Sequence, residues 1–296
     1  MRTEEGVDAA DLSPPGLRRL RGVMAPTREQ RPGAAAARDL VLHDLAIEGG
    51  DVDDRVQSLG DEGWSLVTTR EGWTVAHQIA HLTWTDHAAL LAFDEPIQFA
   101  REVQTFRVDP EGYTNRRAEE WSTIERRELL DLWRNNRHQL LGRLSEAPLT
   151  ARLPWFGPSM SVRTMALARF METWAHGFDI TEAAGLAFPR RESARHVAEL
   201  GARTRRYSFA VRDEPFPEAE IRIELTGPAG QLWSWGPENA PEQVGGDGFD
   251  FALLVTRRRH AADLDVDATG PGAVRWLQIA QAFAGPSGAD PERSLP

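Results

Sequence analysis

The most informative stretch of this sequence is Phe170-Met171-Glu172-Thr173-Trp174-Ala175-His176-Gly177-Phe178-Asp179. It predicts the middle of a helix that begins near Ser161, a good N-terminal cap, and ends near Gly185, which suits the position after a helix. At about 100° per residue, one face of this helix is apolar. That face consists of Leu167, Phe170, Met171, Trp174 and Phe178.

The opposite face of the same helix carries one narrow line of polar chemistry, formed by Met165, Arg169, Glu172, His176 and Asp179. A surface helix normally has a wide polar face. Glu172 and His176 are spaced i, i+4, so their Cβ atoms lie about 6 Å apart. A carboxylate and an imidazole in this arrangement hold a metal ion when a third ligand comes from elsewhere. The alternative is a solvent-exposed strip with an ordinary Glu–His pair.

A second predicted helix, from a cap at Thr74 to Leu91, also carries imidazoles on one line. Its apolar face is formed by Val75, Ile79, Leu82, Leu90 and Phe93, and its opposite line by His77, His81, Trp84, Ala88 and Leu91. If the polar lines of the two helices face each other inside a bundle, they form a site of histidine and glutamate. The alternative is that His77 and His81 are exposed or bonded to backbone carbonyls. Asp86 and His87 point away from His81 and are not expected to be ligands.

Composition limits the class of protein. The chain has 296 residues and a net charge of −11, with a sequence pI near 5.3. This acidity argues against nucleic acid or an anionic membrane as the main partner. No apolar run reaches the length of a membrane span, and the N-terminal region lacks the apolar segment of a signal peptide. We therefore expect a cytoplasmic protein with a small-molecule substrate.

Two residue types are missing, which excludes several chemistries. The chain has no cysteine, so it has no disulfide, no thiolate metal ligand and no cysteine nucleophile. All 34 basic residues are arginine, so a Schiff-base lysine and a lysine general base are also excluded.

The order of patterns along the chain predicts a helix bundle. Residues 1–36 are expected to be a poorly ordered extension. Besides the two helices above, we expect a helix over residues 38–59 interrupted at Gly49-Gly50, and a long one over residues 118–147. Residues 61–72 are expected to be a loop, and residues 94–117 a long crossing loop with a short helix. Four long helices with one long connection indicate a four-helix bundle over residues 37–186.

The pattern changes after this bundle and predicts a small α+β domain over residues 190–285. Residues 221–225 and 231–235 alternate on either side of a Gly-Pro turn, which indicates a hairpin. The other expected elements are helices over residues 192–208, 249–256 and 273–283 and a strand over residues 264–267. Residues 286–296 are expected to be a frayed tail.

Three of these motifs resemble a known family. Gly72-Trp73-Thr74-Val75, Ile79-Ala80-His81-Leu82 and the segment from Glu172 to Ile180 are similar to the mycothiol-dependent maleylpyruvate isomerase family, which belongs to the DinB-like metal-binding four-helix bundles. Thr256-Arg257-Arg258-Arg259-His260 and Ala280-Gln281-Ala282-Phe283-Ala284-Gly285 resemble a subgroup with an added C-terminal domain. The resemblance covers about residues 38–285.

The resemblance implies a metal site. Carried over residue by residue, the ligands are His81, Glu172 and His176. The metal in such proteins is usually zinc, and the same donors also suit nickel, cobalt or iron. The family activates an external thiol, mycothiol, at this metal.

Other residues are candidates for supporting roles. His77 is not a ligand in the family pattern, and we expect it to support the site or to touch the substrate. Asp179 lies one turn beyond His176 and is expected to orient it. Arg169, on the same polar line, is a further candidate catalytic residue. The family enzyme also uses an arginine of its C-terminal domain, which the sequence does not identify among Arg257, Arg258 and Arg259.

Three protein ligands leave a coordination position open, which is typical of catalytic zinc. The leading hypothesis is therefore a zinc-dependent enzyme that uses a mycothiol-like thiol for isomerisation or S-transfer on an electrophilic or conjugated small molecule. One alternative is a metal-dependent hydrolase or lyase that uses activated water or Lewis-acid catalysis. Another is a non-enzymatic, metal-stabilised protein that binds a small molecule or lipid near Trp233 and Trp235.

Overall fold

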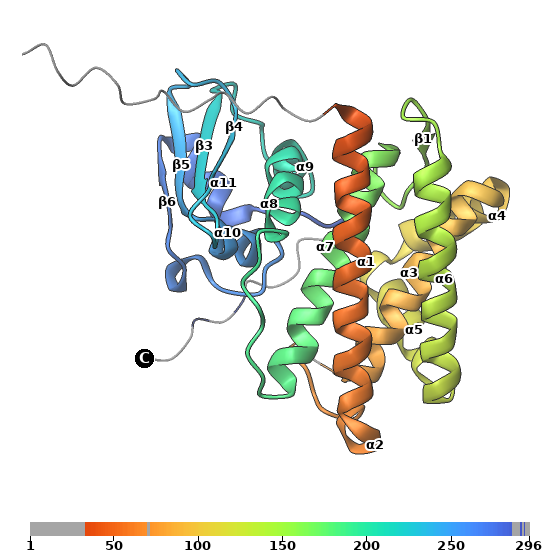
Figure 1. Cartoon of the computed structure of the whole chain (residues 1–296). Coiled ribbons are helices and arrows are strands. Elements are labelled where there is room, and N and C mark those ends of the chain that lie inside the picture. The colour runs from red at the N-terminus through yellow and green to blue at the C-terminus, as the bar shows by residue number, and fades with distance from the viewer. Residues whose placement is uncertain (1–32, 70–71, 286–290, 292, 294–296) are drawn as a thin grey trace, which may run out of the picture. The chain divides into compact units, whose positions relative to one another are not determined.

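The computed structural model describes residues 33–69, 72–285, 291 and 293. The predicted N-terminal extension lies outside the described residues up to residue 32, as does the tail apart from residues 291 and 293. Four long helices lie side by side (Figure 1). They are α1 (Ala34–Ser58), α3 (Val75–Asp94), α6 (Arg126–Glu146) and α7 (Val162–Ala183). Helices α1 and α3 each contact both α6 and α7, which confirms the predicted bundle.

The two helices that carry the predicted polar lines begin where the sequence places their caps. The Thr74 backbone N–H donates to His77 Nδ1 at 3.2 Å at the start of α3. The Ser161 hydroxyl accepts from the Thr164 backbone N–H at 3.2 Å at the start of α7. Gly185, with φ of +68°, lies just beyond α7 in the left-handed conformation that glycine favours.

The prediction of a long crossing loop with one short helix over residues 94–117 is wrong. This region forms two helices, α4 (Pro96–Val108) and α5 (Pro110–Ser122). Each proline occupies the first turn of its helix, where the missing N–H costs nothing, so these prolines start helices instead of ending them. The predicted single helix over residues 118–147 is also wrong, because the Glu125 side chain caps a new helix, α6, by accepting from the backbone N–H groups of Arg127 and Glu128.

Helix α1 is continuous, so the predicted interruption at Gly49-Gly50 is wrong. A Cβ atom on Gly49 would lie 2.8 Å from Nη1 of Arg137, so this glycine makes room for a buried arginine. Within the predicted loop over residues 61–72, the chain forms a short helix, α2 (Gly60–Gly63), and Val67 forms a single β-bridge with Thr74.

The chain after α7 forms the expected mixture of helices and strands. Its helices are α8 (Ala194–Arg203), α9 (Arg205–Ala210), α10 (Gly248–Val255), the 3-10 helix η1 (Ala261–Asp263) and α11 (Pro271–Ile279). Its strands are β3 (Ile221–Thr226), β4 (Leu232–Trp235), β5 (Glu242–Asp247) and β6 (Val266–Thr269), in the sheet order β4-β3-β5-β6. A separate two-stranded sheet of β1 (Arg152–Leu153) and β2 (Met160–Ser161) precedes α7.

The hairpin of β3 and β4 is confirmed, with Ile223 opposite Trp235. Strand β5 was not predicted; it pairs parallel to β3 and antiparallel to β6. The predicted helix over residues 192–208 divides at Thr204 into α8 and α9. The predicted strand over residues 264–267 lies slightly later, as β6, and the predicted last helix ends at Ile279 rather than at residue 283.

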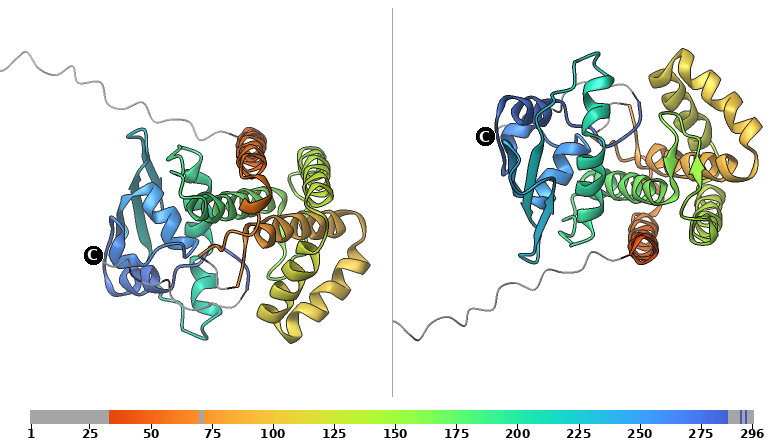
Figure 2. Two further views of the ribbon diagram at one scale, coloured as in Figure 1. Left: turned by 90° about the horizontal axis from the view of Figure 1, so that it is seen from below. Right: turned by 90° about the horizontal axis from the view of Figure 1, so that it is seen from above.

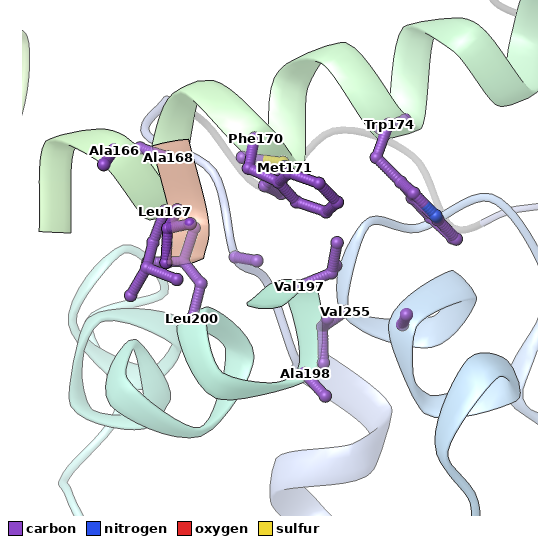
Figure 3. Close-up of a cluster of buried hydrophobic side chains, with 14 of the residues drawn as sticks. Ala166, Leu167, Ala168, Phe170, Met171, Trp174, Val197, Ala198, Leu200 and Val255 are labelled. Carbon is purple, nitrogen blue, oxygen red and sulfur yellow. The ribbon is translucent and has the colours of Figure 1, made fainter. Parts of the chain in front are cut away.

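Helix α7 joins the two parts of the structure. Its Leu167, Phe170 and Met171 side chains pack toward Val197 and Leu200 of α8 (Figure 3). In the views of Figure 2, the sheet lies at one end and the bundle at the other, with α8 between them. Residues from Ala34 onward form one compact unit. The division into domains at residues 186–190 stays a prediction.

Trp233, a residue of the proposed ligand-binding strand, belongs to the core. Its side chain is 1% exposed, and its Nε1 donates to Glu192 Oε2 at 3.0 Å. Within the described part of the chain, the helices are too short or too polar to cross a lipid bilayer.

Candidate metal centre

The polar lines of α3 and α7 meet inside the bundle. One ligand atom from each of His81, Glu172 and His176 lies within 4.8 Å of the others. Glu172 Oε2 lies 3.3 Å from His81 Nε2 and 3.1 Å from His176 Nε2, and the two imidazole centroids are 4.6 Å apart. Trp73 packs beside both rings, at 5.3 and 6.1 Å. The structure thus brings together the three residues that the sequence nominated as ligands.

The polar line of α7 is not a solvent-exposed strip. Arg169, His176 and Asp179 are 1%, 5% and 3% exposed, and the Glu172 side chain is 17% exposed. Helix α7 contacts α1, α3 and α8, so its buried charged groups must be satisfied by other protein groups or by a ligand.

A chain of hydrogen bonds fixes which nitrogen of His176 carries its proton. The Thr68 hydroxyl donates its one hydrogen to the Trp73 carbonyl, at 3.0 Å. In its contact with Gln78, at 2.8 Å, the hydroxyl can therefore only accept, so the Gln78 atom that faces it is the donor Nε2. Gln78 therefore turns its Oε1 toward His176 Nδ1, which donates to it. Because the neutral ring carries its proton on Nδ1, its Nε2 is unprotonated, and the Nε2 lone pair faces the Glu172 carboxylate.

The electrostatics of the site favour the protonation states that metal ligands need. Burial, together with the neighbouring His81, lowers the pKa of His176 to about 3, so its imidazole is neutral at pH 7. Burial raises the pKa of Glu172, whereas the hydrogen bond with His81 and the Arg169 charge lower it, and the balance leaves this pKa well below its usual value. A nitrogen lone pair and a carboxylate oxygen lie 3.1 Å apart, an arrangement that a cation between them would stabilise.

The C-terminal part contributes a cation to this site. Arg258 donates to both carboxylate oxygens of Asp179, from Nη2 at 2.7 Å and from Nε at 3.2 Å. Asp179 Oδ2 in turn lies 3.8 Å from Nδ1 of His176. Arg259 pairs with Glu182 instead, on the next turn of α7. The structure therefore distinguishes the neighbouring arginines, which the sequence did not.

His77 lies one turn from His81 but faces other partners. Its Nδ1 accepts from the Thr74 backbone N–H, and its Nε2 contacts Glu119 Oε2 of α5 at 2.8 Å. The ring also stacks on Trp73, at 6.3 Å between centroids. These contacts place His77 beside the group of three ligand candidates and not within it.

Arg169 belongs to a buried charge network behind Glu172. Its Nη2 lies 3.9 Å from Glu172 Oε1, and its Nη1 lies 3.7 Å from Asp86 Oδ1. Asp86 is bound by Arg137, whose Nε and Nη2 lie 2.9 and 2.8 Å from Oδ2. Arg137 Nη2 also donates to the Thr173 hydroxyl. In the bundle interior, the guanidinium groups of Arg169 and Arg137 thus face the carboxylates of Glu172 and Asp86. Asp86 belongs to this charge network and not to the group of three ligand candidates.

Sequence reasoning missed Gln78, Thr68 and Arg137. Gln78 lies on α3 with no exposed surface, and Arg137 is 6% exposed on α6. The sequence signal that could have identified Gln78 is its position three residues before a candidate ligand histidine, and this signal is weak. Nothing in the local sequence of α6 distinguishes Arg137 from the exposed arginines around it.

Comparisons with known proteins find relatives of this chain. The model of the family described as the mycothiol maleylpyruvate isomerase N-terminal domain matches residues 45–181. Uncharacterized proteins from two strains of Mycobacterium tuberculosis are 45% identical over 245 residues, which cover 83% of this chain and 95% of each relative.

Two solved structures share the fold. The crystal structure of the mycothiol-dependent maleylpyruvate isomerase is 17% identical, with a TM-score of 0.52, and the match covers 80% of this chain and 95% of that one. A histidine-to-alanine mutant of that enzyme is 14% identical, with a TM-score of 0.51 and the same coverage.

The charge network behind Glu172 predicts a large stability effect at Asp86. Asp86→Ala leaves two buried guanidinium groups without this carboxylate, so we expect the free energy of unfolding to fall by about 3–5 kcal/mol. The matched control is Asp131→Ala, which breaks an exposed pair with Arg134 and is expected to cost no more than about 1 kcal/mol. Urea unfolding followed by tryptophan fluorescence measures both. Equal, small losses would show that the network does not stabilise the bundle.

Proposed function

The chain belongs to the mycothiol maleylpyruvate isomerase family, and from this premise we propose that it is a zinc-dependent enzyme that uses an external, mycothiol-like thiol. Its substrate would be an electrophilic or conjugated small molecule, and the reaction an isomerisation or the transfer of the thiol. The observation that carries the proposal is the fixed direction of the hydrogen bonds at His176. They leave the Nε2 lone pair facing an ionised carboxylate, next to a second imidazole.

The donor set fits zinc. Two neutral imidazoles and one carboxylate are the ligands of several catalytic zinc sites, and three protein ligands leave room for a further one. Zinc held by His81, Glu172 and His176 would lower the pKa of a thiol or water and polarise a carbonyl group. The chain has no cysteine, so a sulfur nucleophile must come from another molecule.

The other residues of the site would hold and orient these ligands. Gln78 Oε1 accepts a hydrogen bond from His176 Nδ1 and so keeps Nε2 available as a ligand atom. Asp179 and Arg258 support the same ring from its outer side. Arg169 lies beside Glu172 and favours its ionised form. We propose Arg258 as the arginine of the C-terminal part that acts at this site.

The proposal predicts one zinc ion per chain, bound by residues of both helices. Wild-type protein should contain about one equivalent of zinc, and Glu172→Gln and His81→Ala should lose it. The matched control is His77→Gln, one turn from His81, which keeps an acceptor for the α3 cap and should retain the metal. Elemental analysis of untagged protein measures the content. Wild type that stays metal-free after incubation with zinc would refute the site.

The hydrogen-bond chain predicts a specific role for Gln78. Gln78→Leu removes the acceptor for His176 Nδ1, so we expect zinc affinity to fall by about 10- to 100-fold. Gln78→Glu keeps an acceptor oxygen and should retain most of the affinity. Thr83→Val, a buried change on the same helix away from the ligands, serves as the folding control. Competition with a chromogenic chelator measures the dissociation constants. If leucine and glutamate variants bind zinc equally well, the acceptor does not matter.

The thiol part of the proposal has its own test. Zinc-loaded protein is incubated with a panel of conjugated electrophiles, with and without mycothiol, and products are followed by mass spectrometry. We expect product formation to require both the thiol and the metal, and to be lost in Glu172→Gln. Turnover that is independent of the thiol but lost with the metal would instead support a hydrolase or lyase that activates water.

A further inference from the structure

The side chain of Trp73 packs on both histidines of the candidate metal centre, and the proposed function gives it no role. Trp73 directly precedes the cap of α3 and is 4% exposed. The centroid of its indole lies 5.3 Å from that of the His81 ring and 6.1 Å from that of the His176 ring. Aromatic rings attract each other at these distances. One residue outside the group of three ligand candidates therefore contacts two of its members.

The indole meets the two imidazoles in different orientations. It is nearly parallel to the His176 ring, with 20° between the planes, and it is tilted by 52° against the His81 ring. The His81 ring also packs edge-on against Trp84, at 5.6 Å, so it lies against two indoles. An imidazole binds a metal ion well only when its ring plane directs the nitrogen lone pair at the ion. The packing that holds these planes therefore affects the geometry of the ligands.

Trp73 is held in place at both its backbone and its side chain. Its carbonyl oxygen accepts from the Thr68 backbone N–H at 2.8 Å and from the Thr68 hydroxyl at 3.0 Å. Its indole Nε1 donates to Asn115 Oδ1 of α5 at 3.2 Å. A turn of the indole about its side-chain bonds would break the hydrogen bond to α5. The indole is thus a fixed surface against which the two imidazoles pack.

The electronic character of the rings suits this contact to a metal site. The face of an indole is electron-rich and attracts positive charge. A cation bound at Nε2 of His176 withdraws electrons from the imidazole, so the stacked indole attracts that ring more strongly. Phenylalanine offers a weaker aromatic face at this position, and leucine offers none.

We propose that Trp73 is a positioning residue of the metal centre: its indole, anchored by Asn115, holds the imidazole planes of His81 and His176 in the orientation that metal binding requires. This role rests on the metal centre of the proposed function, but not on the thiol or on the reaction. It also gives α5 a task at the site, although the three ligand candidates come from α3 and α7.

The probe is cobalt(II), which binds histidine and carboxylate donors and whose visible absorption reports the geometry of its ligands. Metal-free, full-length wild type, Trp73→Leu and Trp73→Phe are titrated at a temperature at which circular dichroism shows them to be folded. We expect Trp73→Leu to bind cobalt about tenfold more weakly and with a changed absorption spectrum. Trp73→Phe should restore most of the affinity and the spectrum, because its ring also packs on imidazole. A merely structural role would lower the melting temperature and leave the spectrum unchanged.

The matched control is Trp121→Leu. Trp121 packs beside His87 at 5.7 Å, and His87 is not one of the three ligand candidates, so this variant should keep the cobalt affinity and spectrum of wild type. A second pair of variants tests the anchor on the exposed residue Asn115. Asn115→Ala removes the acceptor of the indole N–H and should weaken cobalt binding about threefold, as expected for one hydrogen bond. Asn115→Asp keeps an acceptor oxygen and should bind as wild type does.

The outcomes separate this role from the metal centre itself. If wild type binds cobalt and a folded Trp73→Leu variant keeps its affinity and spectrum, the role of Trp73 is overturned while the metal centre stands. Equal losses in Trp73→Leu and Trp121→Leu would overturn it as well. If Trp73→Leu does not fold, unchanged binding in Asn115→Ala overturns the role. Wild type that binds no cobalt would refute the metal centre, and the role of Trp73 with it.

Discussion

The carbonyl oxygen of Trp73 determines which nitrogen of His176 carries the proton. A backbone carbonyl can only accept, so it orders the Thr68 hydroxyl, the Gln78 amide and the His176 imidazole in one direction. The last member of this series is left with a lone pair toward Glu172. The short loop before α3 therefore governs the chemistry of α7, although the two segments lie about a hundred residues apart in the chain.

A helix buried on both sides cannot leave charges to solvent. Helix α7 packs its apolar face on α8 and also contacts α1, α3 and α6, so each buried acid on its polar line needs a cation nearby. Arg169 lies beside Glu172, and Arg258 binds Asp179. The same constraint explains Gly49, which leaves space for Arg137 to reach Asp86. Burial of the site thus demands a surrounding charge network, and that network constrains packing several turns away.

Periodicity predicted the site better than it predicted the connections. Helical spacing placed His81 and the Glu172–His176 pair on lines opposite the apolar faces of their helices, because a period of 3.6 determines which side chains share a face. The family resemblance, and not the spacing, selected these three residues as ligands. Gln78 could not be recognised as a site residue from the sequence, because a single glutamine in a helix looks like any other polar residue among apolar ones. Helices α4 and α5 are hard to predict because proline usually ends a helix, whereas Pro96 and Pro110 each lie in the first turn of one. Strand β5 was missed because Gly245 and Gly246 weaken its pattern, and its parallel partner is distant in sequence.

The choice among the three neighbouring arginines lay beyond any local pattern. Which way each side chain points depends on the Schellman turn that ends α10, where Arg257 has φ of +57°, and a left-handed arginine is not predicted by a sequence that offers no glycine there. That turn gives the C-terminal part an electrostatic role in the bundle. Without residues after α10, the Asp179 carboxylate would lose its two-point contact with Arg258, and His176 would face a buried acid with less compensation. The bundle carries every candidate ligand, yet the charge balance around those ligands is completed from outside it.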